Sequence, residues 1–295
     1  SGNSVGIPDG SGGVTLTKAQ YDAGIKLQPP ANYFGDIAIG VTATTRDGTS
    51  TASSTQSLTV SFAAVSEEPV VSISGDLSGT EDTTTSMASS DGVALTNVTL
   101  SIADSEAVAT ADGKILIANT NDSALSGVNI NTTGLTDGGI TVSSSGTGEW
   151  TVTGATSVSQ LQSAIQQLKV VGPEDYAGAM KVTVSARAAE SGVPSSPYIS
   201  NNFIVNLSAV AEAPTLTVSN ITDAVEDAAK ALNTSITIAA VDKDGSDEII
   251  SVQITGLSFQ SNGATLQAAI VDSSGNSVGI PDGSGGVTLT KAQYD

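Results

Sequence analysis

Carboxylates are the side chains with which this chain could do chemistry. The sequence contains 30 Asp and Glu residues, 10 Lys and Arg residues, and neither His nor Cys, which gives a formal net charge of -20. This composition excludes a Ser-His-Asp triad, a Cys nucleophile, a disulfide framework and any metal site built from thiolate or imidazole. Only oxygen ligands remain, and these suit a hard cation such as Ca2+.

The densest acidic group is a loop around Gly245. It places Asp242, Asp244, Asp247 and Glu248 within seven residues, which is how a loop wraps oxygens around calcium. The loop lacks the twelve-residue spacing of an EF-hand, so we expect it to supply only part of a site. An alternative interpretation is a solvated turn, because Asp and Gly also favour turns.

The elements that position these carboxylates belong to a repeat. Residues 1–22 and 274–295 are the same 22 residues without a change, so the sequence repeats with a period of 273. A weaker repeat lies inside this period. Residues 63–69 match residues 208–214 at an offset of 145, Glu81-Asp82 matches Glu226-Asp227 at the same offset, and residues 29–43 match residues 172–186 at an offset of 143.

These offsets predict the domain organisation. Residues 69–213 form one complete domain, residues 214–295 form the N-terminal part of the next, and residues 1–68 form the C-terminal part of an equivalent one. Joining 214–295 to 23–68 regenerates a second whole domain. Two separate parts would expose apolar faces and unpaired strand edges.

The local pattern is that of β-strands. Apolar residues alternate with Thr and Ser at Ile37-Ile39-Val41, Val182-Val184-Ala186, Ile236-Ile238 and similar segments. A hairpin is predicted to turn near residues 145–148, with Trp150 entering the core. One helix is predicted from Val158, Leu161, Ile165 and Leu168, after a capping box at Ser159-x-x-Gln162, with Thr17-x-x-Gln20 in the same region of the other copy. The fold class is therefore all-β, with tandem Ig-like or cadherin-like β-sandwiches and one short helix per domain.

The order of these motifs resembles a known family. A proline-led first strand, a Glu-Asp pair, a DxDGS-type loop, a short helix and a Pro-x-x-Tyr-x-Gly strand start are similar to the Ig-like or cadherin-like extender repeats of giant bacterial RTX adhesins, which type I secretion exports. The resemblance implies an extracellular, calcium-stiffened stalk that holds a ligand-binding tip away from the bacterial surface, as in biofilm adhesins. It also implies that external calcium drives folding after export.

The resemblance implies that carboxylates meet at the joints between domains. At one joint the loop around Gly245 would be joined by Glu212, Glu226 and Asp227. The complete domain would have a reduced site from Glu67, Glu81, Asp82, Asp104 and Glu106. Asp175 and Asn32 precede paired tyrosines in a second loop, which could face the following joint or could serve only as a turn.

Other functions are less compatible with the sequence. Ten aromatic residues leave little for the cleft of a glycosidase, so we expect no enzyme activity. The acidic charge disfavours nucleic acid, and no apolar run approaches the about 20 residues that span a bilayer. The expected partners are neighbouring identical repeats. Two alternatives are a self-assembling filament and a repeat that itself binds a carbohydrate or surface ligand, although the sequence aligns no Thr ladder or surface aromatics between the copies.

Overall fold

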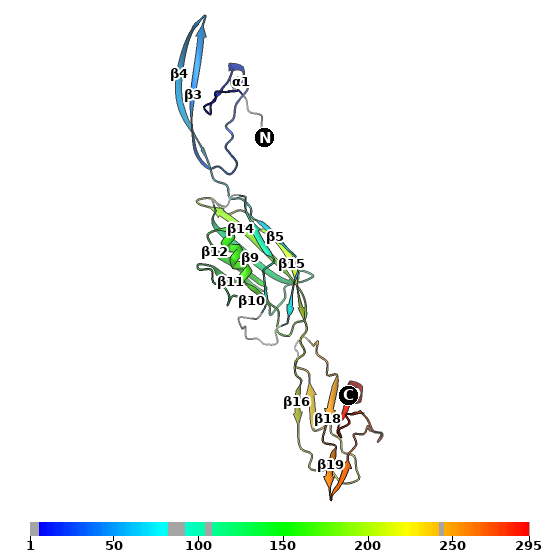
Figure 1. Cartoon of the computed structure of the whole chain (residues 1–295). Coiled ribbons are helices and arrows are strands. Elements are labelled where there is room, and N and C mark those ends of the chain that lie inside the picture. Colours follow the sequence, from blue (N-terminus) through cyan, green and yellow to red (C-terminus); the bar gives the residue numbers. More distant parts are fainter. Residues whose placement is uncertain (1–5, 82–91, 104–107, 242–244, 295) are drawn as a thin grey trace. The chain divides into compact units, whose positions relative to one another are not determined.

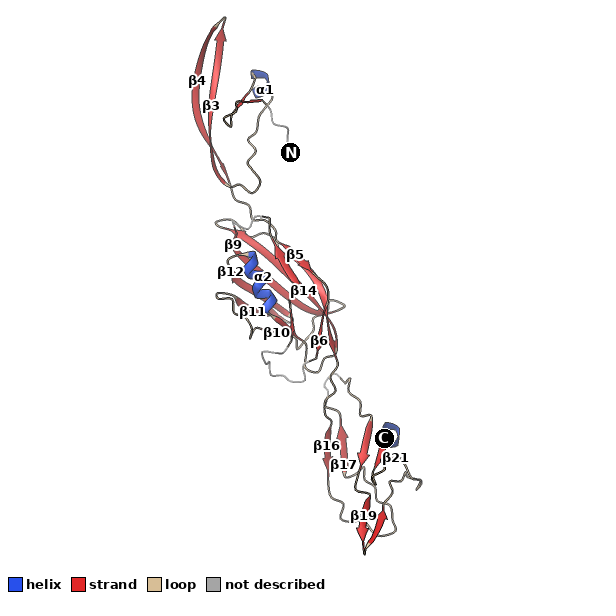
Figure 2. Cartoon of the chain, viewed as in Figure 1, coloured by secondary structure: helices blue, strands red, loops and turns tan. Residues whose placement is uncertain are grey.

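The structure is a computed structural model that describes residues 6–81, 92–103, 108–241 and 245–294. It divides into two compact units, residues 1–66 with 192–194, and the remaining residues. The described residues form 22 strands and three short helices (Figures 1 and 2), which confirms the all-β prediction. The division at residues 66 and 67 lies close to the predicted boundary after residue 68. The predicted boundary at residue 213 is not a boundary between these two units.

The first unit is built around a long hairpin. Its strands pair antiparallel over 13 residues each, from Gly35 opposite Phe62 to Asp47 opposite Ser50. This unit also contains helix α1 (Lys18–Asp22), which is capped by Thr17. Thr17 forms a capping box with Gln20, as the sequence predicted. The elements of this unit are β1 (Ile7–Pro8), β2 (Val14–Thr15), α1 (Lys18–Asp22), β3 (Gly35–Asp47) and β4 (Ser50–Phe62).

Residues 70–208 contain a six-stranded sheet in the order β11-β12-β9-β14-β15-β6. Neighbouring strands are antiparallel except for β15 and β6, which are parallel. Two smaller sheets have the orders β5-β8 and β10-β13-β7. The elements are β5 (Val70–Ile73), β6 (Leu77–Thr80), β7 (Val93–Ala94), β8 (Val98–Ser101), β9 (Val108–Asn119), β10 (Asn129–Asn131), β11 (Thr141–Gly146), β12 (Glu149–Ala155), α2 (Val158–Gln167), β13 (Lys169–Val171), β14 (Gly178–Glu190) and β15 (Ile199–Ser208).

A single hydrophobic core holds these elements together, and we call residues 69–213 the central domain. The core includes Trp150, as predicted, and side chains from both the large and the small sheets. Val158, Leu161 and Ile165 of α2 and the following Leu168 are buried in it, which confirms the predicted helix. The predicted cap at Ser159 is wrong. The helix begins two residues earlier, because the Ser157 side chain accepts a hydrogen bond from the backbone N–H of Gln160.

Residues 214–294 form a second set of short strands without β14 and β15 counterparts. Their sheets have the orders β16-β17, β18-β22-β21 and β19-β20. The elements are β16 (Thr215–Val218), β17 (Ile236–Ala239), β18 (Ser251–Ile254), β19 (Ser258–Ser261), β20 (Ala264–Gln267), β21 (Ile280–Pro281), β22 (Val287–Thr290) and α3 (Lys291–Tyr294).

Strand register supports the repeats read from the sequence. The pairs Gly35–Phe62 and Ile37–Val60 in β3 and β4 correspond to Gly178–Leu207 and Met180–Val205 in β14 and β15, at the offsets of 143 and 145. The pair Thr215–Ala239 stands where Val70–Ser101 stands in the central domain. The identical segments also fold alike, since Ile7 pairs with Thr15 and Ile280 pairs with Thr288.

Candidate metal centre

Glu81 is a buried carboxylate at the end of β6. Its backbone N–H donates to the carbonyl oxygen of Ser208 at 3.0 Å, which continues the pairing of β6 with β15. The residue is 5% exposed, and its Oε1 accepts a hydrogen bond from the backbone N–H of Val210. Its Oε2 is enclosed, with no hydrogen-bond partner among the residues that the structure describes. Because a buried charged oxygen without a donor or a cation is costly, this atom is the strongest candidate for a metal ligand.

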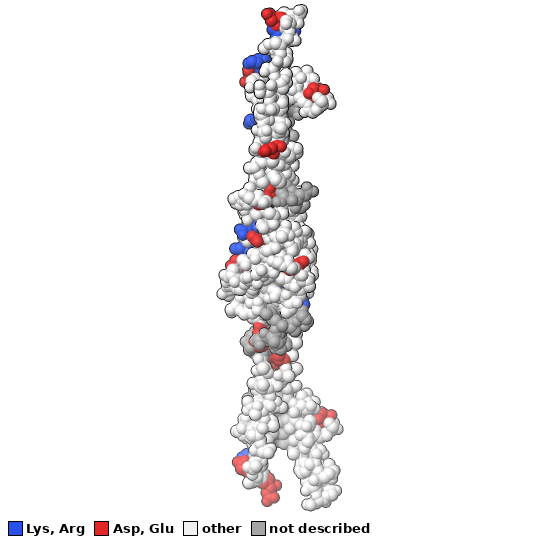
Figure 3. Space-filling view, turned by 90° about the vertical axis from the view of Figure 1, so that its left-hand side faces the viewer, with Lys and Arg blue, Asp and Glu red and all other residues white. Residues whose placement is uncertain are grey.

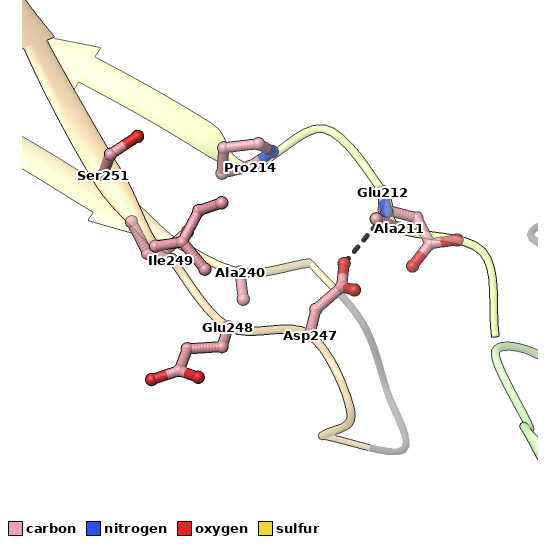
Figure 4. Close-up of a pocket in the computed structure, with 9 residues that line it drawn as sticks. Ala211, Glu212, Pro214, Ala240, Asp247, Glu248, Ile249 and Ser251 are labelled. Carbon is pink, nitrogen blue, oxygen red and sulfur yellow. Dashed lines mark hydrogen bonds between the residues drawn. The ribbon is translucent and has the colours of Figure 1, made fainter. Parts of the chain in front are cut away.

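Asp247 lies beside the chain that follows Val210. Its Oδ2 accepts a hydrogen bond of 2.9 Å from the backbone N–H of Glu212 (Figure 4). These two residues share a pocket with Ala211, Pro214, Ala240, Glu248, Ile249, Ile250 and Ser251. The structure thus places Glu212 next to Asp247 of the acidic loop, through the backbone N–H of Glu212.

Both carboxylates accept hydrogen bonds from the backbone of residues 209–214, which connect β15 to β16 and which we call the linker. Glu81 accepts from the N–H of Val210, and Asp247 accepts from the N–H of Glu212. Amides two residues apart along an extended chain are separated by about 7 Å. The side chain of Glu212 belongs to the same linker, and its Oε1 is also enclosed. These are all oxygen donors, which fit calcium, although calcium requires six to eight oxygens.

Glu67 does not share a site with Glu81, contrary to the sequence prediction. Glu67 precedes β5, and Val71 in that strand accepts a hydrogen bond from the side chain of Asn201. At the other end, Thr80 of β6 pairs with Ser208. The seven residues from Asn201 to Ser208 span about 23 Å of β15, so Glu67 and Glu81 lie at opposite ends of the central domain.

The side chain of Glu67 nevertheless has one property expected of a metal ligand. Its Oε2 is enclosed and has no hydrogen-bond partner within the described part of the chain. Because Val70 pairs with Ser101, Glu67 lies at the end of the domain from which β8 leads into residues 102–107. The loop predicted to share its site, Asp104 with Glu106, lies outside the described residues.

Glu226 and Asp227 also lie away from the site predicted for them. The pair Thr215–Ala239 marks the end of β16 next to Glu212, and the pair Val218–Ile236 marks the opposite end. Glu226 and Asp227 are in the connection that leaves this opposite end, and both are exposed. Asp227 has a φ of 59°, so a turn explains its residue type.

Asp175 and Asn32 occupy the same turn in two copies. Each has a positive φ, of 56° and 60° respectively, which Asp and Asn tolerate better than most residues. The tyrosine that follows each of them donates its hydroxyl to a nearby carbonyl oxygen, 3.3 Å away for Tyr176 and 2.9 Å away for Tyr33. A turn therefore explains the positive φ of both residues. Asp175 is also 5% exposed and lies at the same end of the domain as Glu81.

The remaining predicted ligands do not complete a site. Glu248 points away from Asp247 in Figure 4, and its Oε1 lies 4.0 Å from Nζ of Lys291. Acidic side chains form small separate groups on the face seen in Figure 3, and no group of three or more in the described residues could hold a metal ion. The other candidates, Asp82, Asp242 and Asp244, lie outside the described residues, as do Asp104 and Glu106.

The structure shows one repeated surface feature that the sequence comparison missed. Hydroxyl groups of Thr42 and Thr55 lie 2.9 Å apart across β3 and β4, and those of Ser185 and Ser200 lie 2.8 Å apart at the equivalent place in β14 and β15. The next pair differs. Thr44 and Ser53 continue the hydroxyl row, whereas their equivalents are a guanidinium stacked on a ring, Arg187 on Tyr198. The copies therefore share one hydroxyl pair and not a ladder.

Asp282 lies in a Gly- and Ser-rich loop of the segment that is identical to residues 1–22. The backbone N–H groups of Ser284 and Gly286 donate to its Oδ1 at 2.9 and 2.8 Å. These bonds hold the pKa of the Asp282 carboxyl below its ordinary value of 3.8. Asp9, in the identical segment, has the same bonds from Ser11 and Gly13, and its pKa is lowered in the same way.

We predict that Asp282 titrates below 3.8 in the folded chain. Since its folded pKa is depressed, its contribution to stability is complete above the unfolded pKa and is lost as the pH falls through the folded pKa. Carboxyl carbon chemical shifts, followed by NMR during acid titration, measure this directly. Asp9 should give a similar midpoint, and a midpoint at or above 3.8 for both would contradict the loop geometry.

Comparisons with protein-family models, with curated proteins and with solved structures found no match to this chain. Among the described residues, no helix is long and apolar enough to cross a membrane.

Proposed function

We propose that this chain is a calcium-rigidified extender segment, or stalk, of a large repetitive bacterial surface adhesin or fibre. Its domains would be Ig-like or cadherin-like β-sandwiches, and its role would be mechanical and extracellular without enzyme activity. The observation that carries the proposal is the buried Oε2 of Glu81. The Oε1 of the same residue accepts from the N–H of Val210, and Asp247 accepts from the N–H of Glu212, two residues further along the linker. A divalent cation bound at this joint would compensate the buried negative charge of Glu81.

Charge and repetition support this role. The net charge of -20 places many carboxylates on a chain with few cations, so the joints repel unless a cation neutralises them. A bound ion that links Glu81 to the linker and to Asp247 would remove bending freedom at that point. The unchanged repetition of 22 residues at an offset of 273 also favours a spacer, because a stalk gains reach by duplication.

The proposed ion needs further ligands besides Glu81 and Asp247, because calcium binds six to eight oxygens. Asp242 and Asp244 stand three to five residues before Asp247 in the same loop, so they are the sequence's candidates for the missing ligands. At the opposite end of the central domain, Glu67 is the proposed ligand among the described residues. The sequence offers Asp104 and Glu106 as further ligands there.

Small-angle scattering tests the proposal on a chain of at least two whole periods. We expect excess calcium to lengthen the maximum dimension and to raise the melting temperature relative to chelator. Magnesium at the same concentration is the control, because its smaller, more rigid octahedral shell suits a flexible all-protein site poorly. If calcium changes neither length nor melting temperature, the carboxylates are solvated turns and the stalk is not calcium-dependent.

A repeat that binds its own ligand is the weaker candidate. It requires a surface feature shared by both copies, and the two hairpins share only the hydroxyl pair at Thr42–Thr55 and Ser185–Ser200. Outward hydroxyl pairs are ordinary on β-sheets.

A further inference from the structure

The N-terminal segment of the central domain lies beside the last strand, and both run in the same direction. Strand β6 pairs in parallel with β15, from Leu77 opposite Val205 to Thr80 opposite Ser208. β5 precedes β6 along the length of the domain (Figure 2). The other strand pairs that the structure describes in this domain are antiparallel. The parallel pair therefore joins the two ends of the domain's sequence.

Two side-chain hydrogen bonds extend this contact to the residues before β6. Oδ1 of Asp76 accepts from the backbone N–H of Ile204 at 2.8 Å. Nearer the start of the domain, the side-chain amide of Asn201 donates to the carbonyl oxygen of Val71 at 3.2 Å. The N-terminal segment is therefore bonded to β15 at several points between residues 71 and 80.

Tension on the domain would load this parallel pair along its length. The chain enters the domain at Pro69, and the last strand ends at Ser208. Because Val71 lies beside Asn201, the entry point is near the start of β15, whereas the exit point is at its end, about 23 Å away. A pull on both sides of the domain therefore draws β6 one way and β15 the other. In this geometry the hydrogen bonds between the two strands share the load and must break together.

We propose that the β6–β15 pair, together with the bond from Ile204 to Asp76, is a mechanical clamp that keeps the central domain folded under tension. The proposed stalk function, on which this proposal rests, supplies the tension. Detachment of β5 alone would release residues 70–76, about 24 Å of chain, and would leave β6 bonded to β15. Because forced unfolding is governed by the rate of unfolding, the bonds of the clamp set how long the folded domain survives a load.

Two attachment geometries on the 295-residue chain test the proposal by single-molecule force spectroscopy. The sequence contains no Cys, so pairs of introduced Cys residues can serve as handles. Glu68→Cys with Ser208→Cys loads the clamp in shear, whereas Thr80→Cys with Ser208→Cys pulls the same two strands apart from one end. All three positions are exposed. Unfolding releases about 480 Å of chain in the first geometry and about 440 Å in the second, which identifies the central domain.

The direction of pulling should decide how long the folded domain lasts. All pulls are made in chelator, so that no bound ion contributes. At the same fixed force we expect the folded domain to survive about a hundredfold longer in shear than when the strands are pulled apart from one end, because several hydrogen bonds must break together and not in turn. The two geometries load the same bonds of the same domain, so a difference in overall stability cannot produce this result.

Matched variants make the result specific to the clamp. Asp76→Ala removes the acceptor for Ile204 and should shorten the lifetime in shear about tenfold, whereas Asp76→Asn keeps an oxygen there and should restore it. Ser200→Ala is the control, because its hydroxyl pairs with Ser185 of β14 on the other side of β15, and it should leave the lifetime unchanged. Denaturant unfolding, followed by Trp150 fluorescence, shows whether the variants differ in stability without load.

Two results would overturn the proposal. The first is an equal lifetime in the two attachment geometries, since the parallel pair would then give no resistance specific to shear. The second is a lifetime in shear that Asp76→Ala shortens no more than Ser200→Ala does. Either result would leave the calcium-dependent joint untouched, because the pulls are made in chelator. Conversely, a chain whose length and melting temperature ignore calcium would contradict the proposed function and not the clamp.

Discussion

Glu81→Gln is expected to remove most of the stabilisation that calcium gives to the central domain. A ligand that binds only the folded state adds about 2.7 kcal/mol at a hundred times its dissociation constant. Gln retains the shape of Glu81 and an oxygen for the N–H of Val210, but it lacks the negative charge at Oε2. Calcium titrations by calorimetry and thermal melts, each with and without calcium, measure the effect.

The same variant should behave in the opposite way without calcium. Because Oε2 of Glu81 is enclosed and has no partner among the described residues, its charge destabilises the ion-free domain. Glu81→Gln removes this charge, so in chelator the variant should be at least as stable as the unchanged chain. A purely structural role for Glu81 predicts destabilisation under both conditions, and the sign of the effect in chelator therefore separates the two explanations.

Glu226→Gln is the matched control. It changes the residue that stands 145 positions later in the same Glu-Asp motif, but Glu226 is exposed in this chain and lies away from Glu212. We expect it to leave both the calcium-bound and the calcium-free melts of the central domain unchanged. Equal losses from the two substitutions would indicate a general charge effect and would contradict a site at Glu81.

The sequence predicted the local structure well because local patterns determine it. The spacing of Val158, Leu161 and Ile165 identified α2, since these residues must share one face of a helix. The offsets of 143 and 145 predicted equivalent segments, and the structure shows that β3 with β4 and β14 with β15 pair in equivalent registers. The cap was misplaced by two residues because both Ser157 and Ser159 precede a glutamine three residues later, and only the backbone geometry selects between them.

The sequence predicted the metal centre less well because strand direction decides which carboxylates meet. Glu67 and Glu81 are close in sequence, yet β5 and β6 carry the chain along the length of the domain between them. The order of the two motifs in the sequence does not indicate how far apart Glu67 and Glu81 lie in the folded domain. The partner of Glu81 is the backbone of Val210, which carries no side-chain signal at all. Of the residues predicted to share this site, Glu212 and Asp247 lie together, because the pairing of Thr215 with Ala239 places the segment before β16 beside the loop that follows β17.

Met180→Ala is expected to lower the free energy of unfolding of the central domain by about 2 to 5 kcal/mol. Met180 is 0% exposed near the start of β14, between Asn119 of β9 and Val205 of β15. Truncation removes apolar contacts and leaves a cavity that the neighbouring strands cannot close without losing their pairing. Trp150 is the only tryptophan and lies in the same core, so denaturant unfolding followed by its fluorescence reports on this domain.

Two further substitutions show whether the effect comes from burial. Thr183→Ala changes an outward-facing residue of the same strand and should cost less than about 1 kcal/mol. Ile37 occupies the position of Met180 in β3 but is only half-buried and is not part of the core that contains Trp150, so Ile37→Ala should leave the Trp150 transition unchanged. If Met180→Ala costs no more than these two, the inner face of β14 is not tightly packed.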